Sequence, residues 1–201
     1  MTAEAVIVEM TPPSLPDRVF PPPQGFAAED LDHIPDLPAH TELIDGSLVF
    51  ASPQASFHML VISLLENELR RAAPGDLRVR REMSVILDKD QRPEPDLCVI
   101  SATAVESGRQ TFYHARDVLL VIEVVSPESR TRDRRRKPEL YAEAGIRHFW
   151  LVENDSGKPD VHVFELDPVT RSYVPTGVHH DRLKLTVPFD VDIDLTEIDR
   201  M

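Results

Sequence analysis

Cysteine is nearly missing from this chain: Cys98 is the only one in 201 residues. One cysteine excludes an intrachain disulfide and a four-cysteine zinc site. Long apolar runs are missing too. The longest, residues 118–122, is far shorter than the ~18–20 residues that a membrane helix needs. We therefore expect a protein without membrane segments in a reducing, cytoplasmic setting.

Cations are in the minority, with 22 Lys and Arg against 35 Asp and Glu and a net charge of −13. This acidic balance argues against a protein that coats nucleic acid. However, half of the cations lie in two windows, residues 70–81 and 130–137, which contain only two acids. Such windows can form a local surface that binds a polyanion, or they can be solvated, salt-bridged faces.

Proline is unevenly distributed, because six of the 18 prolines lie within residues 1–25. Proline removes amide donors and favours extended backbone. We therefore predict a flexible tail over residues 1–25 and a single folded domain over residues 26–201. The remaining composition, 41% hydrophobic and 28% charged, is typical of one globular domain of this length.

Hydrophobic periodicity and turn signals predict helices that flank a sheet. One helix follows Ser52-Pro53 and stops at Pro74-Gly75, and a second, residues 138–144, ends at Gly145. Strands are predicted over residues 42–50 (a hairpin), 77–87, 96–100, 118–126, 148–153, 161–165, 183–187 and 191–195. The unbroken aliphatic run in 118–126 predicts a central strand covered on both faces. The expected fold class is α/β or α+β with one mixed sheet.

Two carboxylates fall on predicted strands. Glu123 lies among aliphatic residues, where a buried charge is costly unless it is paired or bound to a metal. Asp96 begins the 96–100 strand. Oxygen ligands on adjacent strands suit Mg²⁺. The alternatives are a buried salt bridge from Glu123 to an arginine of the basic window and a turn or cap role for Asp96.

A series of short motifs stands in a characteristic order along the chain: Glu42-Leu-Ile-Asp-Gly46, Glu94-Pro-Asp96, Ile122-Glu-Val-Val-Ser-Pro127, Asp133, Lys137, Tyr141, Ala144-Gly145 and Phe149-Trp-Leu-Val-Glu153. This order resembles the Uma-two family of restriction-endonuclease-like proteins, within the PD-(D/E)XK nuclease superfamily. The resemblance implies a restriction-endonuclease-like fold, with a central mixed sheet flanked by helices. It also implies hydrolysis of DNA phosphodiester bonds with Mg²⁺, for which Mn²⁺ can substitute.

The resemblance also implies roles for single residues. Asp96, Glu123 and Glu42 would be catalytic residues that hold the metal. The superfamily motif places its lysine at position 125, where this chain has Val125, so Lys137 would be a relocated catalytic lysine. Pro138 departs from the continuous helix expected there. His58 is a further candidate for the site, or else a partly buried helix residue, while Tyr141 and Trp150 are predicted to be core residues.

Arginines of the two basic windows would contact the phosphate backbone of DNA, the expected partner. They are Arg80, Arg81, Arg130, Arg132, Arg134, Arg135 and Arg136. A homodimer is a candidate assembly. Two rival functions remain: a non-catalytic nuclease fold that binds DNA or a protein partner, and an enzyme that uses the same carboxylates on a small phosphoester. The acidic net charge and Val125 favour the first rival.

Overall fold

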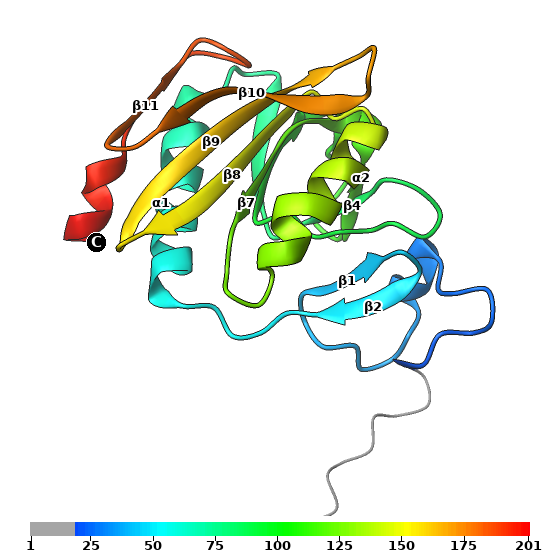
Figure 1. The fold of residues 1–201 in the computed structure, drawn as a ribbon. Helices are drawn as coiled ribbons and strands as arrows, with labels where there is room; N and C mark the ends of the chain where they lie inside the picture. The colour runs from blue at the N-terminus through cyan, green and yellow to red at the C-terminus, as the bar shows by residue number, and fades with distance from the viewer. Residues whose placement is uncertain (1–18) are drawn as a thin grey trace, which may run out of the picture.

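A six-stranded mixed sheet forms the centre of the protein in the computed structural model, which describes residues 19–201 (Figure 1). The strands, in the order in which they lie side by side, are β10 (Ser172–His179), β9 (Lys158–Asp167), β8 (His148–Asp155), β7 (Val118–Val124), β5 (Leu97–Ser101) and β3 (Leu77–Arg81). Within this sheet β7 and β8 run parallel, and the other neighbouring pairs are antiparallel. The predicted mixed sheet is confirmed, whereas most of the predicted tail lies outside the described residues.

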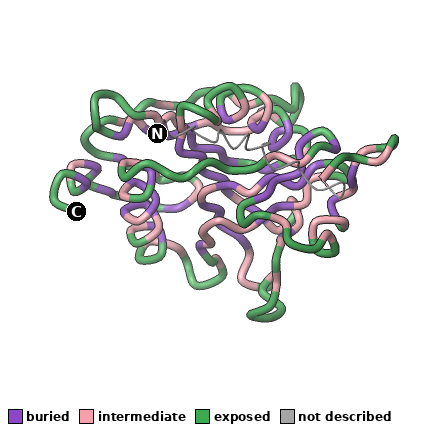
Figure 2. The backbone as a smooth tube through the Cα atoms, turned by 90° about the horizontal axis from the view of Figure 1, so that it is seen from below, coloured by how far each residue is buried: buried purple, intermediate pink, exposed green. Residues whose placement is uncertain are grey.

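One face of the sheet is covered by a large apolar core. Helix α1 (Ser56–Ala72) lies on it together with the hairpin β11 (Arg182–Leu185) and β12 (Val191–Asp194) and the 3₁₀ turn η6 (Leu195–Arg200). Fully buried side chains such as Leu65, Ile122 and Trp150 fill this layer. Figure 2 shows the buried segments gathered inside, with exposed loops around them. The prediction of Trp150 as a core residue is confirmed.

The opposite face is covered by a shorter set of elements. A π-helical turn, η5 (Arg132–Arg136), continues into α2 (Lys137–Glu143), and beside it β4 (Ser84–Ile86) pairs with β6 (Phe112–His114). Tyr141, Phe149 and Cys98 lie in this second core. Burial raises the pKa of the Cys98 thiol to about 12, so the cysteine is an inert core residue.

The N-terminal part of the domain is a hairpin held against the sheet. Strands β1 (Thr41–Ile44) and β2 (Ser47–Phe50) meet at the predicted Asp45-Gly46 turn, where both residues have positive φ. Leu43 pairs with Arg92 of the following segment. The buried guanidinium of Arg92 donates hydrogen bonds to both carboxylate oxygens of Asp32, at 2.7 and 3.0 Å. Asp32 is the last residue of the turn η2 (Ala28–Asp32). These contacts tie the hairpin to η2 and to the segment that precedes β5.

Some predicted elements are wrong in their bounds. Residues 77–87 are two strands, because the chain turns at Glu82 (φ 49°) and β4 then pairs in another sheet. Helix α1 begins at Ser56, after the Ser52-Pro53 signal. Strand β10 is missing from the prediction, since its sequence carries Pro175 and Gly177 and a register shift between them.

Short turns η3 (Ala102–Ala104) and η4 (Ala115–Asp117) complete the elements. Within residues 19–201, no helix is long and apolar enough to span a membrane.

Candidate active site

Glu123 is a buried carboxylate on the central strand β7. It is 2% exposed and points to the α2 side of the sheet. The Tyr141 hydroxyl donates to its Oε1 at 2.6 Å, and the Lys137 ammonium lies 3.1 Å away. Glu123 therefore has a buried ion pair, but with Lys137 and not with an arginine of the basic window. Tyr141, predicted to be only a core residue, also supports this carboxylate.

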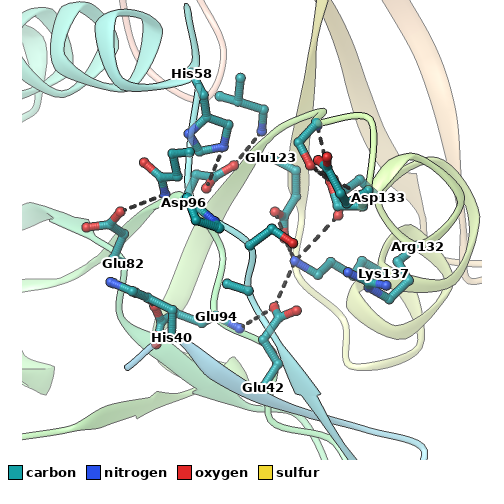
Figure 3. A pocket seen from close by; sticks show the side chains of 18 residues that line it. His40, Glu42, His58, Glu82, Glu94, Asp96, Glu123, Arg132, Asp133 and Lys137 are labelled. Carbon is teal, nitrogen blue, oxygen red and sulfur yellow. Dashed lines mark hydrogen bonds and ion pairs between the residues drawn. The ribbon is translucent and has the colours of Figure 1, made fainter. Parts of the chain in front are cut away.

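Lys137 is the centre of a cluster of charges (Figure 3). Its Nζ lies 2.8 Å from Glu42 Oε1, 3.1 Å from Glu123 Oε1 and 3.5 Å from Asp133 Oδ1. Pro138 does not interrupt the helix, because it lies in the first turn of α2, where proline is tolerated. The continuous path from η5 into α2 aims Lys137 inward, toward β7.

The electrostatics of this cluster leave an excess of negative charge. Burial opposes a charged Lys137, but the carboxylates of Glu123, Glu42 and Asp133 outweigh it and hold the pKa of the ammonium well above its usual value. Burial raises the pKa of Glu123 well above the ordinary range, although Lys137 counteracts part of that rise. The pKa of Asp133 is raised for the same reasons. One ammonium among three carboxylates makes a place that favours a further cation.

Asp96 reaches the same place from the neighbouring strand. Leu97 of β5 lies opposite Ile122 of β7, so the next positions along the two strands are Asp96 and Glu123. Asp96 Oδ2 accepts a hydrogen bond from the Val124 amide at 2.6 Å. Its Oδ1 lies 3.1 Å from Nε2 of His58, in the first turn of α1. Burial lowers the pKa of His58, but Asp96 more than reverses this, and the pKa is raised.

These side chains line one open cavity of about 100 Å³. It contains all five predicted site residues: Glu42, His58, Asp96, Glu123 and Lys137. It also contains Arg132, predicted to contact DNA, and residues to which the sequence analysis gave no role, namely His40, Glu82, Glu94 and Asp133. Asp133 and Glu94 stand in the motif series and could have been singled out from it. His40 and Glu82 carry no sequence signal, and both adopt positive φ (58° and 49°), a strained backbone that often marks functional sites.

Contacts around the hairpin strand β1 tie it into the cavity. Glu42 Oε1 accepts the Glu94 amide at 2.9 Å as well as the Lys137 ammonium. The Glu94 carboxylate pairs with His40 at 2.6 Å. Through these bonds, the hairpin and the segment before β5 set the position of the lysine.

The predicted DNA-contacting arginines do not form one surface. Four of them already have side-chain partners: Arg80 with Tyr113, Arg81 with Glu82, Arg134 with Glu153 and Arg136 with Asp45. Arg132 lines the cavity, and its Nε is buried without a hydrogen bond. Arg130 and Arg135 are exposed, and neither has an ion pair or side-chain hydrogen bond with any residue in the described range 19–201.

The donor set is compatible with a hard divalent cation. Mg²⁺ is usually bound through one or two carboxylates, waters and substrate phosphates, and Asp96 and Glu123 supply two carboxylates to the cavity. Over residues 19–201, no group of three or more His, Cys, Asp or Glu side chains is arranged around one metal position. The fit is therefore to a two-carboxylate site, with Glu42 engaged by Lys137 and by a backbone amide.

Comparisons with known proteins agree on the fold. The Uma2 family profile, described as "Putative restriction endonuclease", matches residues 28–196. Among solved structures, the chain is similar to a putative nuclease belonging to DUF820 from Anabaena variabilis ATCC 29413. The TM-score is 0.66 at 14% identity, covering 86% of this chain and 97% of that one. A comparison with curated proteins gave no match. The structural likeness shows that the two proteins share a fold.

Proposed function

Because this chain belongs to the Uma2 family of restriction-endonuclease-like proteins, we propose that it is a Mg²⁺-dependent endonuclease that hydrolyses phosphodiester bonds of DNA. The observation that carries this proposal is the meeting of Asp96, Glu123 and Lys137 in one cavity. They come from the start of β5, from the middle of the sheet and from α2. Two carboxylates beside an ammonium are the groups that metal-assisted phosphodiester hydrolysis needs.

In the proposed mechanism, Asp96 and Glu123 hold the metal. A divalent ion, if held there by these two carboxylates, would supply Lewis-acid chemistry toward the phosphate and the attacking water. Lys137, beside Glu123, orients the attacking water or offsets charge that develops on the phosphate. Glu42, predicted to join the metal ligands, accepts hydrogen bonds from Lys137 and from the Glu94 amide. We assign its first role to holding the lysine.

A cleavage assay tests this proposal. Supercoiled plasmid and an end-labelled duplex are incubated with the protein in Mg²⁺, Mn²⁺ or EDTA. We expect metal-dependent cleavage that falls by about 10²-fold or more in Asp96→Asn and Glu123→Gln, as for loss of a principal catalytic group. The control is Asp192→Asn, which removes an exposed carboxylate paired with Arg182 outside the cavity. Cleavage in EDTA, or full activity of Glu123→Gln, would contradict the proposal.

A second candidate function is a non-catalytic nuclease fold that binds nucleic acid. The observation in its favour is that the Lys137 ammonium already pairs with Glu42, Glu123 and Asp133. Calorimetric titration with Mn²⁺ separates the two functions, since a degenerate site binds the metal poorly. The cytoplasmic setting and the homodimer stay predictions.

A further inference from the structure

A second cavity, of about 440 Å³, adjoins the carboxylate cavity. The two share five lining residues: Pro53, Gln54, His58, Ser126 and Glu128. The two cavities are therefore neighbours, with Asp96 and Glu123 lining the first and Arg130 lining the second. Phe57 and Pro127 supply apolar wall. Arg130 therefore lies in the cavity next to the carboxylates, where a neighbouring group of a bound chain molecule could reach it.

Arg130 differs from its neighbours in the basic window. It is exposed, and no side chain among residues 19–201 forms an ion pair with it. Arg134 lines the same cavity, but it is bound to Glu153 at 2.6 Å. Arg135 is equally exposed and unpaired, yet it lines another cavity, between α2 and β10. Among the described residues, Arg130 is thus the unpaired cation that lines the second cavity, while Arg132, which also has no ion pair, is partly buried and lines the carboxylate cavity.

We propose that Arg130 and this cavity form a subsite for a phosphate that neighbours the scissile phosphate. The inference rests on the proposed function and deepens it, because it assigns a residue and a cavity to the next phosphate of the DNA strand, a contact that a small isolated phosphoester cannot make. A guanidinium suits this role, since its planar donors can bind two phosphate oxygens at once. Helix α1 starts at the same cavity, and the positive end of its dipole adds to the field of Arg130.

The size of the effect follows from the kind of contact. A charge-assisted hydrogen bond to phosphate is among the stronger polar contacts, and its loss lowers affinity about tenfold or more. Removing one phosphate contact also makes the dependence of log K on log salt shallower by about 0.7–0.9. Removing an exposed arginine that touches no phosphate changes only the long-range electrostatic field at the DNA. Salt screens that field, so the effect on affinity is smaller.

The experiment measures DNA binding in Ca²⁺ at several salt concentrations, and single-turnover cleavage in Mg²⁺. We compare Arg130→Gln with Arg135→Gln, from the same basic window, and with Arg109→Gln. Arg109 is exposed, lines a distant cavity and forms no ion pair within the described residues. All three variants lose one positive charge. We expect Arg130→Gln to weaken binding about tenfold and to lower the salt slope, and the other two to stay within about threefold of wild type.

A second set of substrates carries one neutral methylphosphonate linkage, placed in turn on each side of the scissile phosphate. At one of these positions, the methylphosphonate should cost the wild type about as much affinity as the Arg130→Gln substitution costs on normal DNA. On the same modified DNA, Arg130→Gln should bind only slightly more weakly than it binds normal DNA. This non-additivity ties the arginine to that single phosphate.

The outcomes separate the two proposals. Equal effects of Arg130→Gln and Arg135→Gln, or additive losses with the methylphosphonate, would overturn the subsite and leave metal-dependent cleavage standing. A wild type that binds DNA without cleaving it removes the proposed function, while the binding measurements still decide the subsite. A wild-type protein that neither binds nor cleaves DNA would overturn both the subsite and the proposed function.

Discussion

Ile122 and Glu123 are neighbours on β7 and are almost equally buried, at 0% and 2% exposure, yet they face differently built halves of the molecule. Ile122 enters the α1 side of the sheet, where the core cluster is apolar throughout. Glu123 enters the α2 side, where Lys137 and Tyr141 meet it. Packing stabilises the first half. The second half contains charged groups at the end of the central strand β7. A buried charge is costly there unless it has a partner of opposite charge.

The difference between the two faces shows that the candidate site lies on the α2 side of the sheet. A well-packed apolar face needs no counter-ion. The carboxylates on the other face share one ammonium, and the metal that we propose would add a second cation to them.

The largest effect is expected from Lys137→Ala. Loss of a group that orients water or offsets phosphate charge commonly costs ~10²–10⁴ in rate. Lys137→Arg should not restore the rate, because a planar guanidinium cannot take the place of a compact ammonium. Single-turnover cleavage measures this, with the exposed Lys184→Ala as control. A rate for Lys137→Ala close to that of wild type would remove the lysine from the mechanism.

The contrast between the two halves is tested by a pair of adjacent substitutions. Ile122→Ala should lower the free energy of unfolding by ~2–5 kcal/mol, as is typical of a cavity in a packed core. Glu123→Gln should lower that of the metal-free protein by less than ~1 kcal/mol, because Lys137 keeps Glu42 and Asp133 and the surplus negative charge falls. Denaturant unfolding in EDTA gives both values. A loss of about 3–5 kcal/mol in Glu123→Gln would make its ion pair structural.

A smaller effect is expected from removing a single hydroxyl. Tyr141 and Tyr173 both pack near Phe149, and the hydroxyl of each donates one hydrogen bond that a substitution by Phe deletes. The Tyr141 hydroxyl donates to the Glu123 carboxylate, and the Tyr173 hydroxyl donates to the Ile146 carbonyl at 2.8 Å. Each substitution should cost about 1–3 kcal/mol of stability. In Mn²⁺ titrations, however, only Tyr141→Phe should lower the affinity, since only that hydroxyl orients a proposed ligand. Equal metal affinities of the two variants would show that Tyr141 only packs.

The smallest effect is on the pH dependence of stability. Burial raises the folded-state pKa of Glu123, so the folded protein holds that proton more tightly than the unfolded chain does. The resulting stability is complete below the unfolded pKa of about 4.3 and is lost as the pH rises through the folded-state value. Glu123→Gln should therefore lose less stability than wild type between pH 5 and pH 8 in EDTA. Identical pH profiles would contradict the shift.

Much of the candidate site could be predicted because its residues carry local signals. A charge inside an aliphatic strand singles out Glu123, and the order of short motifs adds Asp96 and Lys137. What could not be predicted depends on long-range contacts. Arg136 pairs with Asp45, 91 residues away, and Arg134 with Glu153, so the basic window looks like one surface in sequence and is divided in space. In the same way, the turn at Glu82 follows from pairing in a second sheet and not from local pattern.

The central claim is that Asp96 and Glu123 form a metal site, and a crystal soaked in Mn²⁺ tests it most directly. The account predicts anomalous density in contact with both carboxylates. The contradicting result is an absence of density there at saturating Mn²⁺, with Lys137 still paired to Glu42 and Glu123.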